Sequence, residues 1–192
     1  MKINYSIILD RKIRVAIVGC GRISKNHFLA ITKQQADMDL ISICDNNQDV
    51  LSSHEVRYQV KGYLDLKEML ENENIDLVAM CTPSGIHSIQ TKICAKYCVN
   101  VITEKPMATK WKDGITMVSD CEDAGVRLFV VKQNRKNPTL RLLKRAITEG
   151  RFGKIYMAHI NVFWTRPQEY YDQAAWRGTL ELDGGAFMNQ AS

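Results

Sequence analysis

Short apolar runs alternate with longer amphipathic stretches along the first two thirds of the chain. The runs are almost continuously hydrophobic, which is typical of strands that are buried on both faces of a parallel sheet. We expect such strands at residues 13–18, 40–44, 75–81, 99–103 and 126–131. Strands that alternate with helices in this way predict an α/β fold with a doubly wound, Rossmann-type parallel sheet that is covered by helices on both faces.

The stretches between the strands carry apolar residues at helical spacing, so each predicted helix has one apolar stripe. The residues that define these stripes are, in chain order, Ile23, Ala30 and Ile31; Leu66, Met69 and Leu70; Ile86, Ile89 and Ile93; and Trp111, Ile115 and Val118. We expect each stripe to face the sheet.

The pattern changes after Val131. Apolar residues Leu140, Leu143 and Ile147 share one face of a predicted helix that ends at Gly150, and residues 154–162 predict a longer strand. We interpret residues 1–12 as an N-terminal appendage and 13–132 as a dinucleotide-binding domain. Residues 133–192 then begin an α+β substrate and oligomerisation domain with a mainly antiparallel open sheet. The strands that would complete this sheet are missing, so we expect the chain to be an amino-terminal fragment.

Composition and charge narrow the function classes. The 192 residues are 45% hydrophobic, enough for a sizeable core, and carry a net charge of +5 that is scattered rather than clustered. A scattered positive charge favours an anionic small molecule over a nucleic acid. No apolar run is long enough for a membrane span, and the start is too short for a signal peptide, so we expect a cytoplasmic protein. The six cysteines form no Cys-x-x-Cys pair, and we expect no metal site.

A glycine turn directly after the first strand is the strongest chemical signal. Gly19 and Gly21 are followed by Arg22 and Ile23 at the start of a predicted helix. Glycines let the backbone approach a pyrophosphate, and the helix N-terminus offers unpaired N–H groups to its charge. The third glycine of the pattern is replaced by Ser24, which is still small. We therefore predict a dinucleotide site here, with a chance glycine turn as the alternative.

Asp45 ends the second predicted strand and bears on the choice of cofactor. A carboxylate at this place accepts hydrogen bonds from a ribose 2′-hydroxyl and repels a 2′-phosphate, which favours NAD over NADP. The alternative is a strand-end aspartate that caps the turn at Asn46-Asn47. The two interpretations are compatible.

Several further motifs resemble those of the Gfo/Idh/MocA family of sugar oxidoreductases. The resemblance runs from about Ile13 to the last residue. It rests on the glycine turn, Thr82-Pro83 with His87 behind it, Glu104-Lys105-Pro106, Trp176-Arg177 and the closing Gly-Gly-Ala segment. Within the family, the chain resembles the branch that oxidises UDP-N-acetylglucosaminuronic acid at C3 in bacterial surface-polysaccharide (O-antigen, lipopolysaccharide) biosynthesis. The resemblance implies an NAD-dependent dehydrogenase that acts on a nucleotide sugar and that is a homo-oligomer when full length.

The resemblance also implies a set of site residues. The cofactor-binding residues are Gly19, Gly21, Arg22, Ile23, Asp45, Thr82, Pro83, His87, Glu104, Lys105, Gln133, Trp176 and Arg177. The substrate-binding residues are Lys105, Arg135, Arg166 and Asn189, of which Lys105 and Asn189 are the catalytic ones. Arg135, Arg166 and Arg177 can each bind a carboxylate or diphosphate through a planar guanidinium, with exposed salt-bridge arginines as the alternative. Tyr170 and Tyr171 either stack on the uracil or only pack.

Lys105 follows a central strand, at the sheet edge where open α/β folds bind their ligands. A lysine that is partly desolvated and close to a positively charged cofactor has a lowered pKa and can help to deprotonate a sugar hydroxyl. The alternative is a structural ion pair between Lys105 and an acid such as Glu104.

Asn189 departs from the family pattern, which has Asp-x-x-x-His after the Gly-Gly turn. Asn189 occupies the place of the aspartate and cannot act as a base, and the histidine would fall one residue past the end of the chain. We therefore expect the fragment itself to be inactive. Two other functions stay open: dehydrogenation of another sugar or a cyclitol such as inositol, and NAD binding without catalysis in a sensor. His27, near the glycine turn, is more often structural than ligand-binding at such a place.

Overall fold

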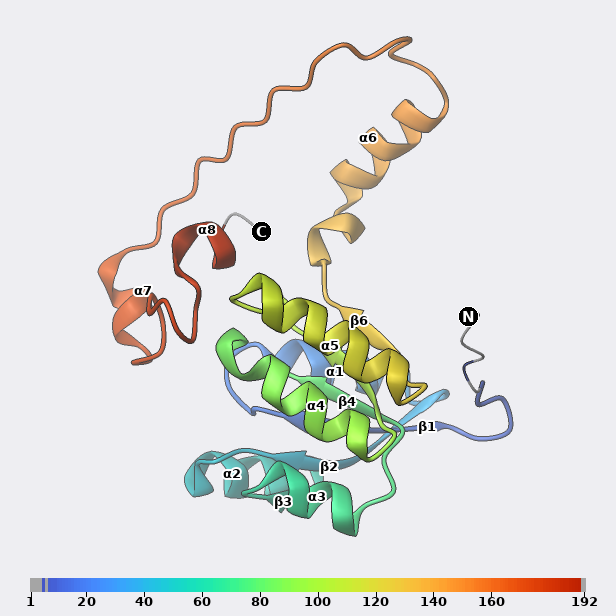
Figure 1. The fold of residues 1–192 in the computed structure, drawn as a ribbon, viewed down its shortest axis with the longest axis vertical. Coiled ribbons are helices and arrows are strands. Elements are labelled where there is room, and N and C mark those ends of the chain that lie inside the picture. Colours follow the sequence, from blue (N-terminus) through green and yellow to red (C-terminus); the bar gives the residue numbers. More distant parts are fainter. Residues whose placement is uncertain (1–4, 6, 191–192) are drawn as a thin grey trace.

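The computed structural model describes residue 5 and residues 7–190, and its centre is one six-stranded parallel sheet (Figure 1). The strands are β1 (Ile13–Val18), β2 (Met38–Cys44), β3 (Lys61–Tyr63), β4 (Leu77–Met80), β5 (Asn100–Thr103) and β6 (Leu128–Val130). Their order across the sheet is β3-β2-β1-β4-β5-β6, with all neighbours parallel. This order is that of the Rossmann fold and confirms the predicted fold class. The short edge strand β3 lies outside the apolar runs from which strands were predicted.

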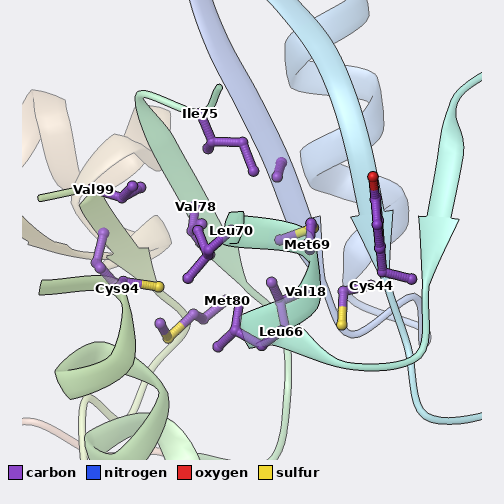
Figure 2. Packing of buried hydrophobic residues seen from close by; sticks show 13 residues of the cluster. Val18, Cys44, Leu66, Met69, Leu70, Ile75, Val78, Met80, Cys94 and Val99 are labelled. Atoms are coloured by element: carbon purple, nitrogen blue, oxygen red, sulfur yellow. The ribbon is translucent and has the colours of Figure 1, made fainter. Parts of the chain in front are cut away.

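Helices cover both faces of this sheet, and consecutive residues of β1 show why. Val15 and Ile17 point into one buried cluster, which includes residues of α1 (Ser24–Lys33) and α2 (Gln48–Tyr58). Ala16 and Val18 point into the other, with α3 (Leu66–Asn72) and α4 (His87–Lys96), and Figure 2 shows this second cluster around Met69 and Met80. Side chains of a strand alternate between faces, so a continuous apolar run fills both layers.

Two helices bury a different stripe from the predicted one. In α5 (Trp111–Asp123) the buried residues are Gly114, Met117 and Cys121, whereas the predicted Trp111, Ile115 and Val118 are exposed. In α4 the buried residues are His87, Thr91, Cys94 and Ala95, and the predicted Ile89 is exposed. Small residues let the two helices pack closely against each other and the sheet. Both stripes have helical spacing, so periodicity alone could not choose between them.

The region after β6 contains helices but no strand in its described part, which ends at residue 190. α6 (Pro138–Thr148) forms as predicted, and short helices α7 (Gln168–Asp172) and α8 (Gly185–Asn189) follow. The strand predicted at 154–162 is wrong: this segment is an extended chain that pairs with no other described segment (Figure 1). A strand exists only where a neighbour takes up its N–H and C=O groups, and the hydrophobic pattern does not guarantee such a neighbour.

An ion pair connects the described part of the predicted appendage to the sheet domain. Arg11 and Arg14 both donate to the carboxylate of Asp76, at N–O distances of 2.5 and 2.9 Å. Burial opposes ionisation of Asp76, but these hydrogen bonds outweigh it and lower the pKa of the carboxyl well below its usual range. The predicted appendage also includes residues 1–4 and 6, and the predicted second domain includes residues 191–192. These residues lie outside the described ones. Within the described ranges, no helix is both long and apolar enough to cross a bilayer.

Candidate active site

The strand order places the glycine turn beside the loop that follows β4. Gly19 leaves β1 with φ of +88°, and a Cβ on it would lie 2.9 Å from the carbonyl carbon of Cys81 and the backbone nitrogen of Thr82. Only glycine fits this close approach. Gly21, by contrast, has no atom within 4 Å of a built Cβ, so the turn is open on the side that a ligand would approach.

The start of α1 adds an electrostatic reason for an anion at this turn. Ile23 is the N-cap residue, and no side chain caps the helix there. The Ser24 and Asn26 nitrogens donate to the Gly21 and Ile23 carbonyls, and the helix dipole favours negative charge at this end. Arg22 is exposed beside them, with its guanidinium 5.6 Å from the ring centre of Tyr170. The predicted residues Gly19, Gly21, Arg22 and Ile23 thus form one cradle that fits the pyrophosphate of a dinucleotide.

Asp45 lies beside this cradle and accepts two backbone hydrogen bonds. One carboxylate oxygen accepts from the Cys20 nitrogen at 2.7 Å and the other from the Asn47 nitrogen at 2.9 Å. The turn-capping alternative is therefore observed. Each oxygen keeps a further lone pair, so a ribose hydroxyl can still bind, and the residue fits NAD as well.

The loop after β4 positions Thr82 and Pro83 at the same edge, but it buries His87. The His87 ring is fully buried, with Nε2 3.0 Å from the Thr82 carbonyl and Nδ1 3.2 Å from the Met107 carbonyl. Burial lowers the pKa of His87, and the neutral ring can donate to only one of the two carbonyls. The His87 side chain thus ties the loop after β4 to the loop after β5, and its role in binding the cofactor stays a prediction.

The Glu104 side chain hydrogen-bonds with His27. The two side chains meet at 2.8 Å between Glu104 Oε1 and His27 Nε2, and both are mostly buried. Glu104 Oε2 also accepts from the backbone nitrogen of Lys105 at 3.3 Å. The structure therefore does not contain the Lys105–Glu104 side-chain pair that was the alternative to a catalytic lysine. The Lys105-Pro106 peptide is cis.

The Lys105 amino group contacts Asn189 of α8. Its Nζ donates to the backbone carbonyl of Asn189 and lies 3.2 Å from the side-chain Oδ1. Burial lowers the pKa of Lys105; Lys132 and Arg166 act in the same direction, while Glu104 and Asp183 oppose them. The two residues predicted to be catalytic are thus brought together, at the carboxyl end of β5.

The segment that carries Asn189 rests on the loop after β4. The Gly85 nitrogen donates to the Leu182 carbonyl at 2.9 Å. A Cβ on Gly85 would lie only 2.1 Å from the Glu181 carbonyl oxygen, so this contact requires glycine. Gly85 belongs to a 3-10 turn, η1 (Ser84–Ile86). In the sequence Gly85 has no motif of its own, and its place two residues after Pro83 is the signal that could have found it.

Three arginines gather around one tyrosine near the glycine turn. Arg22, Arg166 and Arg177 place their guanidinium carbons 5.6, 4.9 and 4.5 Å from the ring centre of Tyr170. Arg177 also donates to the Tyr170 carbonyl at 2.6 Å, and Arg166 donates to Gln190 at 2.9 Å. Among the described residues, no carboxylate forms an ion pair with any of the three. This arginine cluster can therefore receive an external anion.

The remaining predicted residues are divided between this cluster and a separate turn. Trp176 packs beside the cluster, with its ring centre 5.8 Å from the Arg177 guanidinium carbon. Gln133 and Arg135 lie on the exposed 3-10 turn η2 (Gln133–Lys136) after β6.

The cysteines near the site are buried thiols. Burial raises the pKa of Cys20 and of Cys44 to about 12, which keeps both protonated. In the part of the chain that the structure describes, no group of three His, Cys, Asp or Glu residues could hold a metal ion.

The strand order and the glycine cradle together define a dinucleotide-binding protein of the Rossmann class. Comparison of the sequence with protein families agrees. The model of the oxidoreductase family with an NAD-binding Rossmann fold matches residues 13–132, and that of the Gfo/Idh/MocA C-terminal domain matches residues 140–192. The chain belongs to the Gfo/Idh/MocA family, which confirms the resemblance seen in the motifs, and NAD is the cofactor of this family's Rossmann domain.

Two solved structures are especially similar. The WlbA dehydrogenase from Bordetella pertussis, in complex with NADH and UDP-GlcNAcA, has 55% sequence identity and a TM-score of 0.93, covering 96% of this chain and 55% of its own. The Chromobacterium violaceum WlbA dehydrogenase, with the same two ligands, has 53% identity and a TM-score of 0.93, covering 100% and 55%. A curated relative, myo-inositol 2-dehydrogenase from Thermotoga maritima, is 31% identical over 148 residues, which are 77% of this chain and 44% of that protein. The chain thus spans about half the length of these relatives.

Proposed function

We propose that the protein oxidises the C3 hydroxyl of UDP-N-acetylglucosaminuronic acid, with NAD as the hydride acceptor. One observation carries the proposal: Lys105 holds a half-buried amino group at the same edge of the sheet as the glycine cradle, free of any ion pair among the described residues and in contact with Asn189. The likeness to the two WlbA dehydrogenases, whose structures hold NADH and UDP-GlcNAcA, supports the choice of substrate.

The chemistry requires two transfers from one carbon. NAD, when bound, accepts the hydride from C3, and the C3 hydroxyl must lose its proton to leave a ketone. Lys105 takes that proton on its neutral amine, and the burial that lowers its pKa increases the share of the neutral form near pH 7. Asn189 cannot accept a proton, so its amide serves to orient Lys105 or a sugar hydroxyl.

Substrate recognition falls to the arginine cluster. Arg166 and Arg177 offer planar guanidinium groups that suit a sugar carboxylate or a diphosphate, and Tyr170 offers an aromatic face between them. Arg135 stays a predicted substrate contact. Assembly into a homo-oligomer and a cytoplasmic location also stay predictions.

The test measures NADH formation by purified full-length protein with NAD and UDP-N-acetylglucosaminuronic acid. Protein-bound NADH is followed by fluorescence in a single turnover, because a tightly held cofactor would hide steady-state release. Myo-inositol and UDP-N-acetylglucosamine, which lacks the carboxylate, serve as comparison substrates. We expect NADH only with the uronic acid. Lys105→Ala should bind NAD but lose on the order of 10²- to 10⁴-fold in rate.

A matched control distinguishes the loss of the proposed base from the loss of one positive charge. Lys110 is an exposed lysine five residues after Lys105, and Lys110→Ala should react at the normal rate. NADH formed from myo-inositol instead would overturn the substrate. Normal turnover by Lys105→Ala would overturn the mechanism. Tight NAD binding with no turnover on any substrate would favour the sensor function.

A further inference from the structure

Asp183 is a buried carboxylate that the proposed mechanism does not use. Its residue is only 2% exposed, and it lies at the Gly-Gly turn that precedes α8. One of its oxygens accepts from the side-chain Nδ2 of Asn189, and the other accepts from the backbone nitrogen of Gly178 at 2.7 Å. A buried charge needs such partners, and of these two Gly178 precedes Asp183 in the chain while Asn189 ends the helix that follows it.

The contacts form a chain from Asp183 through Asn189 to Lys105. An amide side chain can be turned either way, and its orientation follows from its neighbours. An ionised carboxylate only accepts hydrogen bonds and an ammonium group only donates them. Asn189 must therefore turn its nitrogen to Asp183 and its oxygen to Lys105 Nζ, which is the arrangement observed.

We propose that Asp183 is a positioning residue for Lys105: it fixes the Asn189 amide so that its oxygen holds the lysine amino group at the carboxyl end of β5. Through Gly178 it also ties the Trp176-Arg177 pair to α8, so the arginine cluster and Lys105 keep one mutual geometry. The inference rests on the proposed role of Lys105, but its test does not depend on the identity of the substrate.

Asp183→Asn is the informative variant because it keeps the shape and removes the charge. The new amide can accept from Asn189 or from Gly178, but its own NH₂ group cannot accept from the other. The contact with Lys105 then loses its fixed orientation. The negative charge that opposes the lowering of the Lys105 pKa is also lost, so the pKa of Lys105 falls further.

The first measurement is the pKa of Lys105 in full-length protein without cofactor or substrate. It is followed by NMR on protein with lysine labelled at the ε-carbon, with Lys105→Arg to assign the signal. We expect a lower pKa in Asp183→Asn than in the wild type. Glu181→Gln is the matched control, because it removes an exposed negative charge two residues away and should leave the Lys105 pKa unchanged. An unchanged pKa in a folded Asp183→Asn protein overturns the proposal.

The second measurement is the pH profile of turnover. Because the base must be unprotonated, a lower Lys105 pKa moves the acidic limb of kcat to lower pH. We expect kcat at its optimum to fall on the order of 10²-fold from misplacement of the amine, with KM little changed. A fall in kcat with the limb unmoved would indicate a structural role only and would overturn the positioning role.

A third measurement uses only the wild-type protein. In the wild type, the side-chain NH₂ protons of Asn189 should exchange slowly with solvent, since they are bonded to a buried carboxylate. Rapid exchange would overturn the proposal. If the uronic acid proves not to react, the proposed substrate fails, while the pKa and exchange measurements still decide the role of Asp183.

Discussion

The two halves of the chain, residues 13–132 and 133–190, differ in how far their apolar residues are buried. In the first, every inner strand contributes buried apolar residues to the core, and residues such as Ile17 and Met80 have no exposed surface. In the second, α6 has no buried residue and the apolar side chains of 155–163 are exposed. Yet Asn189, Asp183 and Arg177 of the proposed site come from this second half. The first half provides its own stability, and the second provides groups that are positioned by docking on the first.

This difference explains why the site is held by so few contacts. The docked segment reaches the sheet domain through the Gly85–Leu182 backbone bond, the Thr109–Glu181 hydrogen bond and the Lys105–Asn189 contact. The Arg22 guanidinium also lies over the Tyr170 ring. Such contacts orient side chains but bury little apolar surface, which is the main source of folding free energy. Substitutions in the sheet domain should therefore change stability, and those at the docking contact should change activity.

The largest expected effect comes from Met80→Ala in the sheet domain. Met80 is fully buried between β1, α3 and α4 (Figure 2), and the substitution leaves a cavity. The free energy of unfolding should fall by about 2–5 kcal/mol. Denaturant unfolding measures this loss, and an m-value equal to that of the wild type shows that only the stability has changed. A loss below about 1 kcal/mol would mean that this cluster is loosely packed and does not supply the stability of the sheet domain.

The sheet domain was also the part most predictable from sequence. Continuous apolar runs predicted five of its six strands and both covered faces, because a doubly buried strand leaves a strong pattern. The facing stripes of α4 and α5 were not predictable. Trp111 is the largest apolar residue of α5 but is exposed, while Gly114 is buried, since close packing there favours small size over hydrophobicity.

A smaller effect is expected from Gly85→Ala at the docking contact. The added Cβ would overlap the Glu181 carbonyl, so residues 178–190 must shift and Asn189 must move from Lys105. We expect turnover of the full-length protein to fall on the order of 10²-fold, which corresponds to about 2.7 kcal/mol. Far-UV circular dichroism and NAD affinity should be retained. A parallel loss of NAD binding would show that the two halves are not separable in this way.

The site itself could be predicted only where a motif marks it. The glycine turn and the Glu-Lys-Pro segment located Gly19, Gly21 and Lys105, because strand ends meet at one edge of a parallel sheet. Asp183 was not predicted as a site residue because an aspartate before two glycines has the composition of an ordinary turn. The sequence also does not reveal that the His87 ring is buried between the carbonyls of Thr82 and Met107.

The smallest effect should come from Met157→Ala, the same substitution as at Met80 but in the exposed segment. Met157 is 86% exposed, so truncation removes no buried contact and leaves no cavity. The free energy of unfolding should stay within about 0.5 kcal/mol of the wild type. Denaturant unfolding measured beside Met80→Ala makes the comparison direct, because the deleted atoms are identical. A loss above about 1 kcal/mol would mean that residues 155–163 are covered in solution, and the second half would then have packing of its own rather than only docked groups.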